Sequence, residues 1–210
     1  MNPRVLVVPV LAAGLVLSAA ACGSGSSSSA AAKAAPAQPA AGISASQASA
    51  SLTDFGPACS SVPSSGPGSF TGMSTAPVAT AASANPVLST LVTAVKKAGL
   101  VDTLNSASSI TVFAPDNAAF AKLPAATLDK VLADKAELTK ILTYHVAAGR
   151  LTPAELASGT TIKTLEGGSI TPTLTNGTYT VNGAHVICGN VQTANATVYI
   201  INTVMMPPTS

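Results

Sequence analysis

The segment Thr111–Phe120, which reads TVFAPDNAAF, decides the fold. Residues 110–114 are mostly apolar and β-branched, which predicts a short strand. Pro115 ends that strand because proline has no N–H to donate to a neighbouring strand. Asp116 or Asn117 can then cap a short helix with a side-chain oxygen. The segment therefore predicts a strand that passes directly into a helix.

Two further segments follow the first in the chain. Thr143–Val146 reads TYHV, and Ala196–Pro208 reads ATVYIINTVMMPP. Together the three segments resemble the front motif, the Tyr-His pair and the closing strand of the fasciclin (FAS1) family, over about residues 54–208. Asp116 departs from the pattern, because the family often has Thr there. The resemblance marks as structural motif residues Phe113, Pro115, Tyr144, His145 and Asn202.

This resemblance implies an α+β fold in which β-sandwich-like antiparallel strands are wrapped by short helices. It also implies an adhesion and interaction module rather than an enzyme. Within the family, the layout is similar to mycobacterial cell-surface and secreted immunogenic fasciclin antigens. That likeness rests on Cys59, Cys188, and the segments Leu100–Asn105 (LVDTLN) and Ala194–Tyr199 (ANATVY).

Local sequence patterns favour the same α+β class. Asn85-Pro86 is a helix start, and Gly99 ends the helix that follows. That helix carries aliphatic residues at helical spacing, namely Val87, Leu88, Leu91, Val92 and Val95. Asp134–Glu137 and Thr152–Glu155 each have the residues of a capping box.

After Gly159 the pattern changes from helices to strands. Gly167-Gly168, Asn176-Gly177 and Asn182-Gly183 are hairpin-turn signals between segments rich in Thr, Val and Ile. Helices followed by antiparallel hairpins predict an α+β domain. The expected strands are Ile162–Leu165, Ser169–Leu174, Thr178–Val181, His185–Val191 and Thr197–Met205.

The N-terminus predicts export and a lipid anchor. Arg4 precedes an apolar run, Val5–Leu17, that is too short to span a membrane and suits a signal peptide. Small residues then lead to Cys22, as at a lipoprotein cleavage site, although Ala19 stands where Leu or Val is usual. We expect a signal peptide at 1–21 and an acylated Cys22 on the outer face of the cell membrane. The alternatives are an ordinary secretory signal and a released form.

Between the anchor and the domain, residues 22–53 are almost entirely small or polar and predict a disordered tether. The chain as a whole is 47% hydrophobic and 9% charged. From Asp54 onward, seven Lys and Arg150 face eight carboxylates, so the domain is formally neutral. That balance argues against a nucleic-acid partner. Residues 54–208 suffice for a single domain, which we expect to be monomeric.

The cysteines predict one disulfide. If Cys22 is acylated, Cys59 and Cys188 remain, and an exported chain meets an oxidising environment. A bond between them would pin the segment Pro57–Thr75, expected to be extended, against the last sheet. The alternative is two free thiols. A metal site is not expected, because no His or Cys cluster accompanies them.

Catalytic candidates are few, and neither an active site nor a cofactor is expected. His145 ends an apolar helix, so we interpret it as a buried structural imidazole; the alternative is a base or ligand. His185 lies in a predicted hairpin and is expected to be half exposed. Asp116 and Asp129 are isolated, and no nucleophile motif accompanies these residues.

Two functions from different classes remain open. The first is adhesion through a protein or matrix partner, with the contact surface near Asp116, Asp129 and Lys130. In animal FAS1 domains a Tyr-His pair flanked by aliphatic residues has been linked to cell adhesion, but here those aliphatics are expected to face the core. The second is an envelope carrier for a small apolar ligand or lipid, in a pocket lined by Leu, Val and Met. A hydrolase is a third, weaker alternative.

Overall fold

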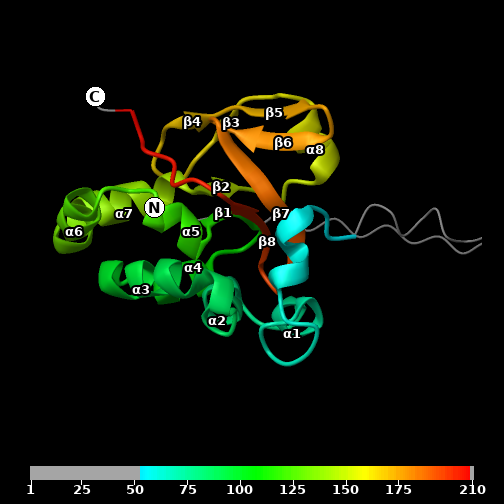
Figure 1. The fold of residues 1–210 in the computed structure, drawn as a ribbon, viewed down its shortest axis with the longest axis horizontal. Helices are drawn as coiled ribbons and strands as arrows, with labels where there is room; N and C mark the ends of the chain where they lie inside the picture. Colours follow the sequence, from blue (N-terminus) through cyan, green and yellow to red (C-terminus); the bar gives the residue numbers. More distant parts are fainter. Residues whose placement is uncertain (1–52, 209–210) are drawn as a thin grey trace, which may run out of the picture. The chain divides into compact units, whose positions relative to one another are not determined.

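The computed structural model describes residues 53–208. The expected signal peptide at 1–21, Cys22, and all of the tether except Thr53 lie outside the described residues. The helices fall mainly in the first half of the domain and the hairpins in the second half (Figure 1). The α+β class expected from the sequence is confirmed.

Short helices make up most of the first half of the domain. Asn85 begins one of them as expected, with its side-chain oxygen accepting from the Val87 N–H at 3.0 Å. Gly99 ends α3 in the left-handed conformation, with φ of 74°, which a residue without Cβ adopts without strain. The helical elements are η1 (Pro57–Ser61), α1 (Phe70–Ser74), α2 (Val78–Ser83), η2 (Pro86–Leu88), α3 (Ser89–Ala98), α4 (Val101–Ser106), α5 (Asn117–Ala121), α6 (Ala125–Ala133), α7 (Lys135–Tyr144) and α8 (Pro153–Ala157).

The two expected capping boxes differ in the structure. Thr152 and Glu155 form the full reciprocal box at the start of α8. At the start of α7, Asp134 accepts from the Ala136 and Glu137 N–H groups. The return bond from Glu137 is not formed, so α7 begins with a simple aspartate cap.

Six strands form one sheet, in the order β2-β1-β8-β7-β6-β5, and β3 and β4 form a separate two-stranded sheet. The expectation of antiparallel strands holds for every pair of strands within residues 53–208 except β1 with β8, which run parallel. Parallel neighbours need a long crossover, and here the whole chain between Pro115 and Ala196 supplies it. The strands are β1 (Ile110–Pro115), β2 (Val146–Ala148), β3 (Ile162–Lys163), β4 (Ser169–Ile170), β5 (Pro172–Thr175), β6 (Thr178–Val181), β7 (Ala184–Gln192) and β8 (Ala196–Ile201).

Three segments differ from the sequence-based expectation. The strand expected at 169–174 breaks at Thr171, because β4 pairs with β3 while β5, which begins at Pro172, pairs with β6. The closing strand ends at Ile201 rather than at Met205, because the side chain of Asn202 bonds back to β7. The segment 57–75 is not extended, since it forms η1 and α1.

The central strands β1 and β8 are buried along their full length. Alternate side chains point to opposite faces of a sheet. Val112 and Ile200 therefore join the core under the helices, whereas Phe113, Tyr199 and Ile201 join a second core under the hairpins. In Figure 1, α2–α5 lie on one side of these strands, and the β5–β6 hairpin with α8 lies on the other.

Candidate functional site

His145 joins three parts of the fold. It follows α7, and its carbonyl oxygen accepts from the Phe113 N–H of β1 at 2.8 Å. Its Nε2 accepts from the Met205 N–H at 3.0 Å, and its Nδ1 lies 2.8 Å from the carbonyl oxygen of Ile141. Because Nε2 is the acceptor, Nδ1 carries the proton and donates to Ile141, which fixes a neutral tautomer.

Burial keeps this imidazole neutral. His145 is 2% exposed, and desolvation lowers its pKa from 6.5 to about 4, although the hydrogen bond to Ile141 acts in the opposite direction. Both ring nitrogens are engaged with backbone, so neither can act as a base or hold a metal in this conformation. This geometry matches the expected structural imidazole.

Tyr144 fastens α7 to the hairpins on the other face. Its hydroxyl donates to the carbonyl oxygen of Ser169 at 3.1 Å and accepts from Asn182 Nδ2 at 2.7 Å. Burial raises the pKa of this phenol above 10.0. Ile141, Leu142 and Val146, which flank the Tyr-His pair, are also buried. The whole motif therefore faces inward.

The other motif residues lie in β1 or directly after β8. Phe113 is fully buried and stacks on Tyr199 with ring centroids 5.8 Å apart. Pro115 is buried and pairs with Ile201 in the β1–β8 register. The side-chain oxygen of Asn202 accepts from the N–H of His185 at 3.1 Å, while His185 itself is exposed rather than half exposed.

The residues expected to meet a partner do not form a single cluster. Asp116 is half buried and caps α5 by accepting from the Ala119 N–H. Asp129 and Lys130 are exposed on α6. Within residues 53–208, no hydrogen bond or ion pair joins Asp116 to either of them. The structure leaves the α6 pair available on the surface and assigns Asp116 to a helix cap.

The disulfide between Cys59 and Cys188 is present, with the two residues 129 positions apart. It joins η1 to the middle of β7, next to a backbone bridge between Phe55 and Gly189. No group of three or more His, Cys, Asp or Glu residues that could hold a metal occurs between residues 53 and 208.

Sequence analysis missed the role of Asn195. Its Nδ2 donates to the carbonyl oxygens of Leu104 and Ala107 at 2.8 and 2.7 Å, and its Oδ1 accepts from the Val78 N–H at 2.8 Å. In sequence Asn195 was only part of an Asn-x-Thr triplet at a turn. In the fold it joins α2, α4 and the β7–β8 turn.

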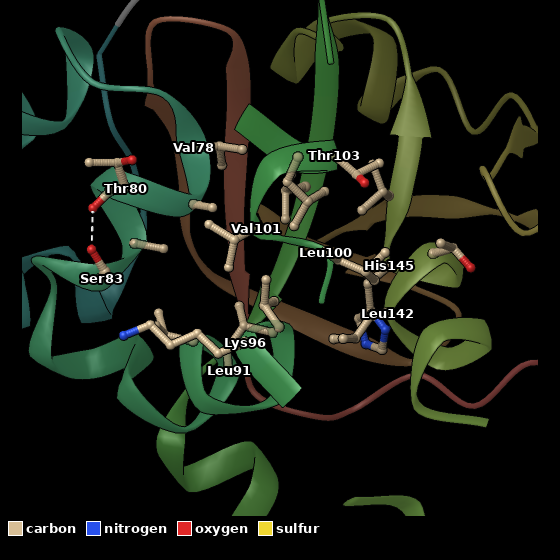
Figure 2. A pocket seen from close by; sticks show the side chains of 18 of the residues that line it. Val78, Thr80, Ser83, Leu91, Lys96, Leu100, Val101, Thr103, Leu142 and His145 are labelled. Atoms are coloured by element: carbon tan, nitrogen blue, oxygen red, sulfur yellow. Dashed lines mark hydrogen bonds between the residues drawn. The ribbon is translucent and has the colours of Figure 1, made fainter. Parts of the chain in front are cut away.

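An apolar cavity lies between α2, α3, α4 and the junction of α7 with β2 (Figure 2). Its volume is about 130 Å³, and its lining is mostly aliphatic, with Phe113, a few hydroxyls, His145 and Lys96 in addition. Sequence analysis expected a lining of Leu, Val and Met, but methionine is absent from it. Two other hollows in the described part measure about 20 Å³ each.

Three comparisons place the chain among known proteins. Residues 86–207 match the model of the fasciclin domain. The chain is 50% identical to the immunogenic protein MPT70 of Mycobacterium tuberculosis over 161 residues, which cover 73% of this chain and 82% of that protein. It is 52% identical to the cell surface glycolipoprotein MPB83 of Mycobacterium bovis over 148 residues, which cover 68% and 66%.

The fold resembles that of a FAS1 domain pair from the insect cell adhesion molecule fasciclin I, with a TM-score of 0.53 and 19% identity over 65% of this chain and 52% of that one. A structural likeness at that identity supports the fold alone. The domain match, by contrast, spans more than half of the sequence. The expected family is thereby confirmed: the chain belongs to the fasciclin family, and its relatives include a mycobacterial immunogenic protein and a mycobacterial cell surface glycolipoprotein.

Proposed function

We propose that this protein is a lipid-anchored cell-surface module that mediates adhesion through its FAS1 domain. The observation that carries the proposal is the 52% identity to a protein named as a cell surface glycolipoprotein. The sequence around Cys22 supports the same anchor. No helix within residues 53–208 is both long and apolar enough to cross a bilayer.

The contact surface is proposed to lie on α6. Val131 is buried on the inner side of this helix, while Ala125, Asp129 and Lys130 are exposed. The Tyr-His pair cannot serve as the contact, because it is buried and bonded to backbone. A neutral domain gives modest affinity with weak salt dependence, and many anchored copies would strengthen the attachment by multivalency.

Two measurements test this proposal. First, the mature protein should begin at Cys22 and partition into detergent, because the acyl chains supply its membrane affinity. Cys22→Ala should abolish that partitioning or leave the precursor uncleaved. Recovery of the unaltered protein in the aqueous phase, without lipid mass, would overturn the anchor.

Second, adhesion of cells displaying the protein should depend on α6. Asp129→Lys combined with Lys130→Glu should reduce binding to host cells or matrix without changing net charge. The control is Lys97→Glu combined with Asp102→Lys, which exchanges charges on two exposed positions outside α6. Equal adhesion by all strains, with surface display verified by antibody, would contradict the α6 contact.

A second function, binding of an apolar ligand in the envelope, is favoured by a separate observation. The cavity of about 130 Å³ is more than six times larger than the two smaller hollows, and its wall is almost wholly apolar. Adhesion does not require such a cavity.

A further inference from the structure

The cavity has the dimensions of a site for one narrow apolar group. An engineered apolar cavity of about 150 Å³ stays dry and binds benzene or xenon, and this cavity measures about 130 Å³. Leu91, Val101 and Leu104 are among the side chains that line it. By comparison with benzene, that volume holds about six carbons of a single alkyl chain and leaves no room for a second chain.

Side-chain hydrogen bonds fix the helices that line the cavity. Asn105 on α4 accepts through Oδ1 from the N–H groups of Ala79 and Thr80 at the start of α2. Asn195 bonds to backbone on both helices. These bonds join α2 to α4, which also pack against each other, so this wall of the cavity is preformed.

The inner wall offers no polar group for a ligand's head. His145 reaches the cavity, but both of its nitrogens are engaged with Ile141 and Met205. The Thr143 hydroxyl also bonds to backbone, at the carbonyl oxygen of Thr139. A ligand with a polar end must therefore leave that end at the mouth of the cavity.

The exposed side chains of the lining include one lysine and one leucine. Lys96 is the sole charged side chain in the lining, and it is exposed. Its charged end points away from the Leu100 and His145 side of the cavity (Figure 2). The one ion pair among residues 53–208 joins Lys140 to Glu166, so Lys96 has no carboxylate partner there. Leu165 also belongs to the lining and is 48% exposed.

We propose that this cavity binds a single-chain anionic amphiphile, a short fatty acid of about six carbons, with its alkyl chain between α2 and α4 and its carboxylate at Lys96. The proposal deepens the second function above and does not depend on adhesion. The aliphatic lining matches the chain, the volume limits it to one, and the unpaired Lys96 matches the charge of the head group.

Isothermal titration with hexanoate, whose chain matches the volume of the cavity, tests the proposal. The protein is the full chain with Cys22→Ala, so that no acyl group of its own competes. We expect one hexanoate per chain and shifts of the Val101 and Leu104 methyl signals in NMR spectra. Absence of binding, or shifts confined to residues outside the cavity, would overturn the proposal.

Matched variants test the binding of the alkyl chain separately from that of the carboxylate. Ala82→Leu places a larger side chain in the cavity wall and should weaken binding about tenfold, because each displaced methylene forfeits about 0.8 kcal/mol. Ala126→Leu, at an exposed position on α6, should not weaken it. If Ala82→Leu lowers the melting temperature, Val92→Phe on the half-buried side of α3 replaces it. Unchanged affinity in a folded filling variant would contradict the proposal.

The contribution of the Lys96 charge is tested by replacing Lys96 and its neighbour Lys97 one at a time. Lys96→Gln should weaken hexanoate binding about threefold, since exposed ion pairs are weak, and should leave hexanol binding unchanged. Lys97→Gln is the control, because Lys97 is exposed and does not line the cavity. Equal effects of both variants would remove Lys96 from the proposal.

Two further outcomes concern other partners. Binding to phosphatidylglycerol vesicles without binding to hexanoate would reassign the surface to a bilayer and overturn the proposal. Adhesion of Ala82→Leu cells should be unchanged, so each proposed function can fail alone.

Discussion

Replacing His145 by glutamine should remove most of the acid sensitivity that this residue gives to the fold. In the native protein Nε2 accepts from the Met205 N–H, and Nδ1 bonds to Ile141. Protonation would place a hydrogen on both nitrogens, so that one of them faced another N–H. The native state therefore resists protonation, and burial lowers the pKa of His145 to about 4.

The magnitude follows from the difference between folded and unfolded states. Below pH 6.5 the unfolded chain takes up a proton on His145, whereas the folded chain does so only near pH 4. The stability contributed by the neutral imidazole is full above pH 6.5 and is lost as the pH falls towards 4. At 1.36 kcal/mol per pH unit, the loss amounts to about 3 kcal/mol.

Asp54 gives the folding stability a pH dependence of the opposite sign. Burial raises its pKa from 3.8 to about 6, so the folded chain binds this proton more readily than the unfolded chain. Its contribution to stability therefore grows as the pH falls from about 6 towards 3.8. Because Asp54 is only partly buried, solvent screening reduces that contribution. Asp54 is present in both the wild type and the His145→Gln variant, so its contribution cancels when the two are compared at the same pH.

Urea unfolding at pH 7.5 and pH 4.5 measures the effect. At pH 7.5, His145→Gln should be less stable by about 1–3 kcal/mol, because the Met205 N–H loses a well-placed acceptor. At pH 4.5 this deficit should shrink by about 2–3 kcal/mol. His185→Gln replaces the other, exposed histidine and should follow the wild type at both pH values. A deficit that stays constant between the two pH values would refute the buried neutral imidazole.

Two further predictions concern long-range links. Reduction of Cys59–Cys188 should lower the unfolding free energy by up to about 4–5 kcal/mol, because the bond closes a long loop in the unfolded chain. Calorimetry measures this loss, and an unchanged melting temperature after reduction would contradict the prediction. Asn195→Ala should cost about 2–3 kcal/mol, because it leaves partly buried groups on α2 and α4 without partners. Asn176→Gly is the matched control in the other Asn-x-Thr triplet, since φ at Asn176 is 51° and glycine accepts that conformation.

Features that depend on adjacent residues were predictable from the sequence. Asn85 and Asp116 cap their helices, and a cap needs only a side-chain oxygen and the first turn. Asn176-Gly177 and Asn182-Gly183 form the expected turns, with positive φ at both residues of each pair. The strand β6, which lies between these turns, has the predicted bounds.

Features that depend on distant segments were not predictable in the same way. The side chain of Asn195 bonds to Val78, which lies 117 residues earlier. The parallel pairing of β1 with β8 likewise depends on how the intervening chain returns. The wall of the cavity likewise depends on such bonds, because Asn105 and Asn195 join α2 to α4. A single sequence predicts local geometry, but it does not show which helices these side chains will join.

The link of the Tyr-His pair to adhesion in animal FAS1 domains has two interpretations, direct contact with a partner or support of the fold, and the position of the pair separates them. A contact residue must be accessible, but Tyr144 and His145 are each 2% exposed here, and their polar atoms bond within the domain. Replacement of either residue leaves buried groups unpaired and destabilises α7, which packs beside α6. In the proposed adhesion function the pair therefore acts by holding the surface helices in place, and loss of adhesion in its variants should follow loss of folded protein. The exposed charges of α6 should behave differently, because Asp129 and Lys130 can change without disturbing the core.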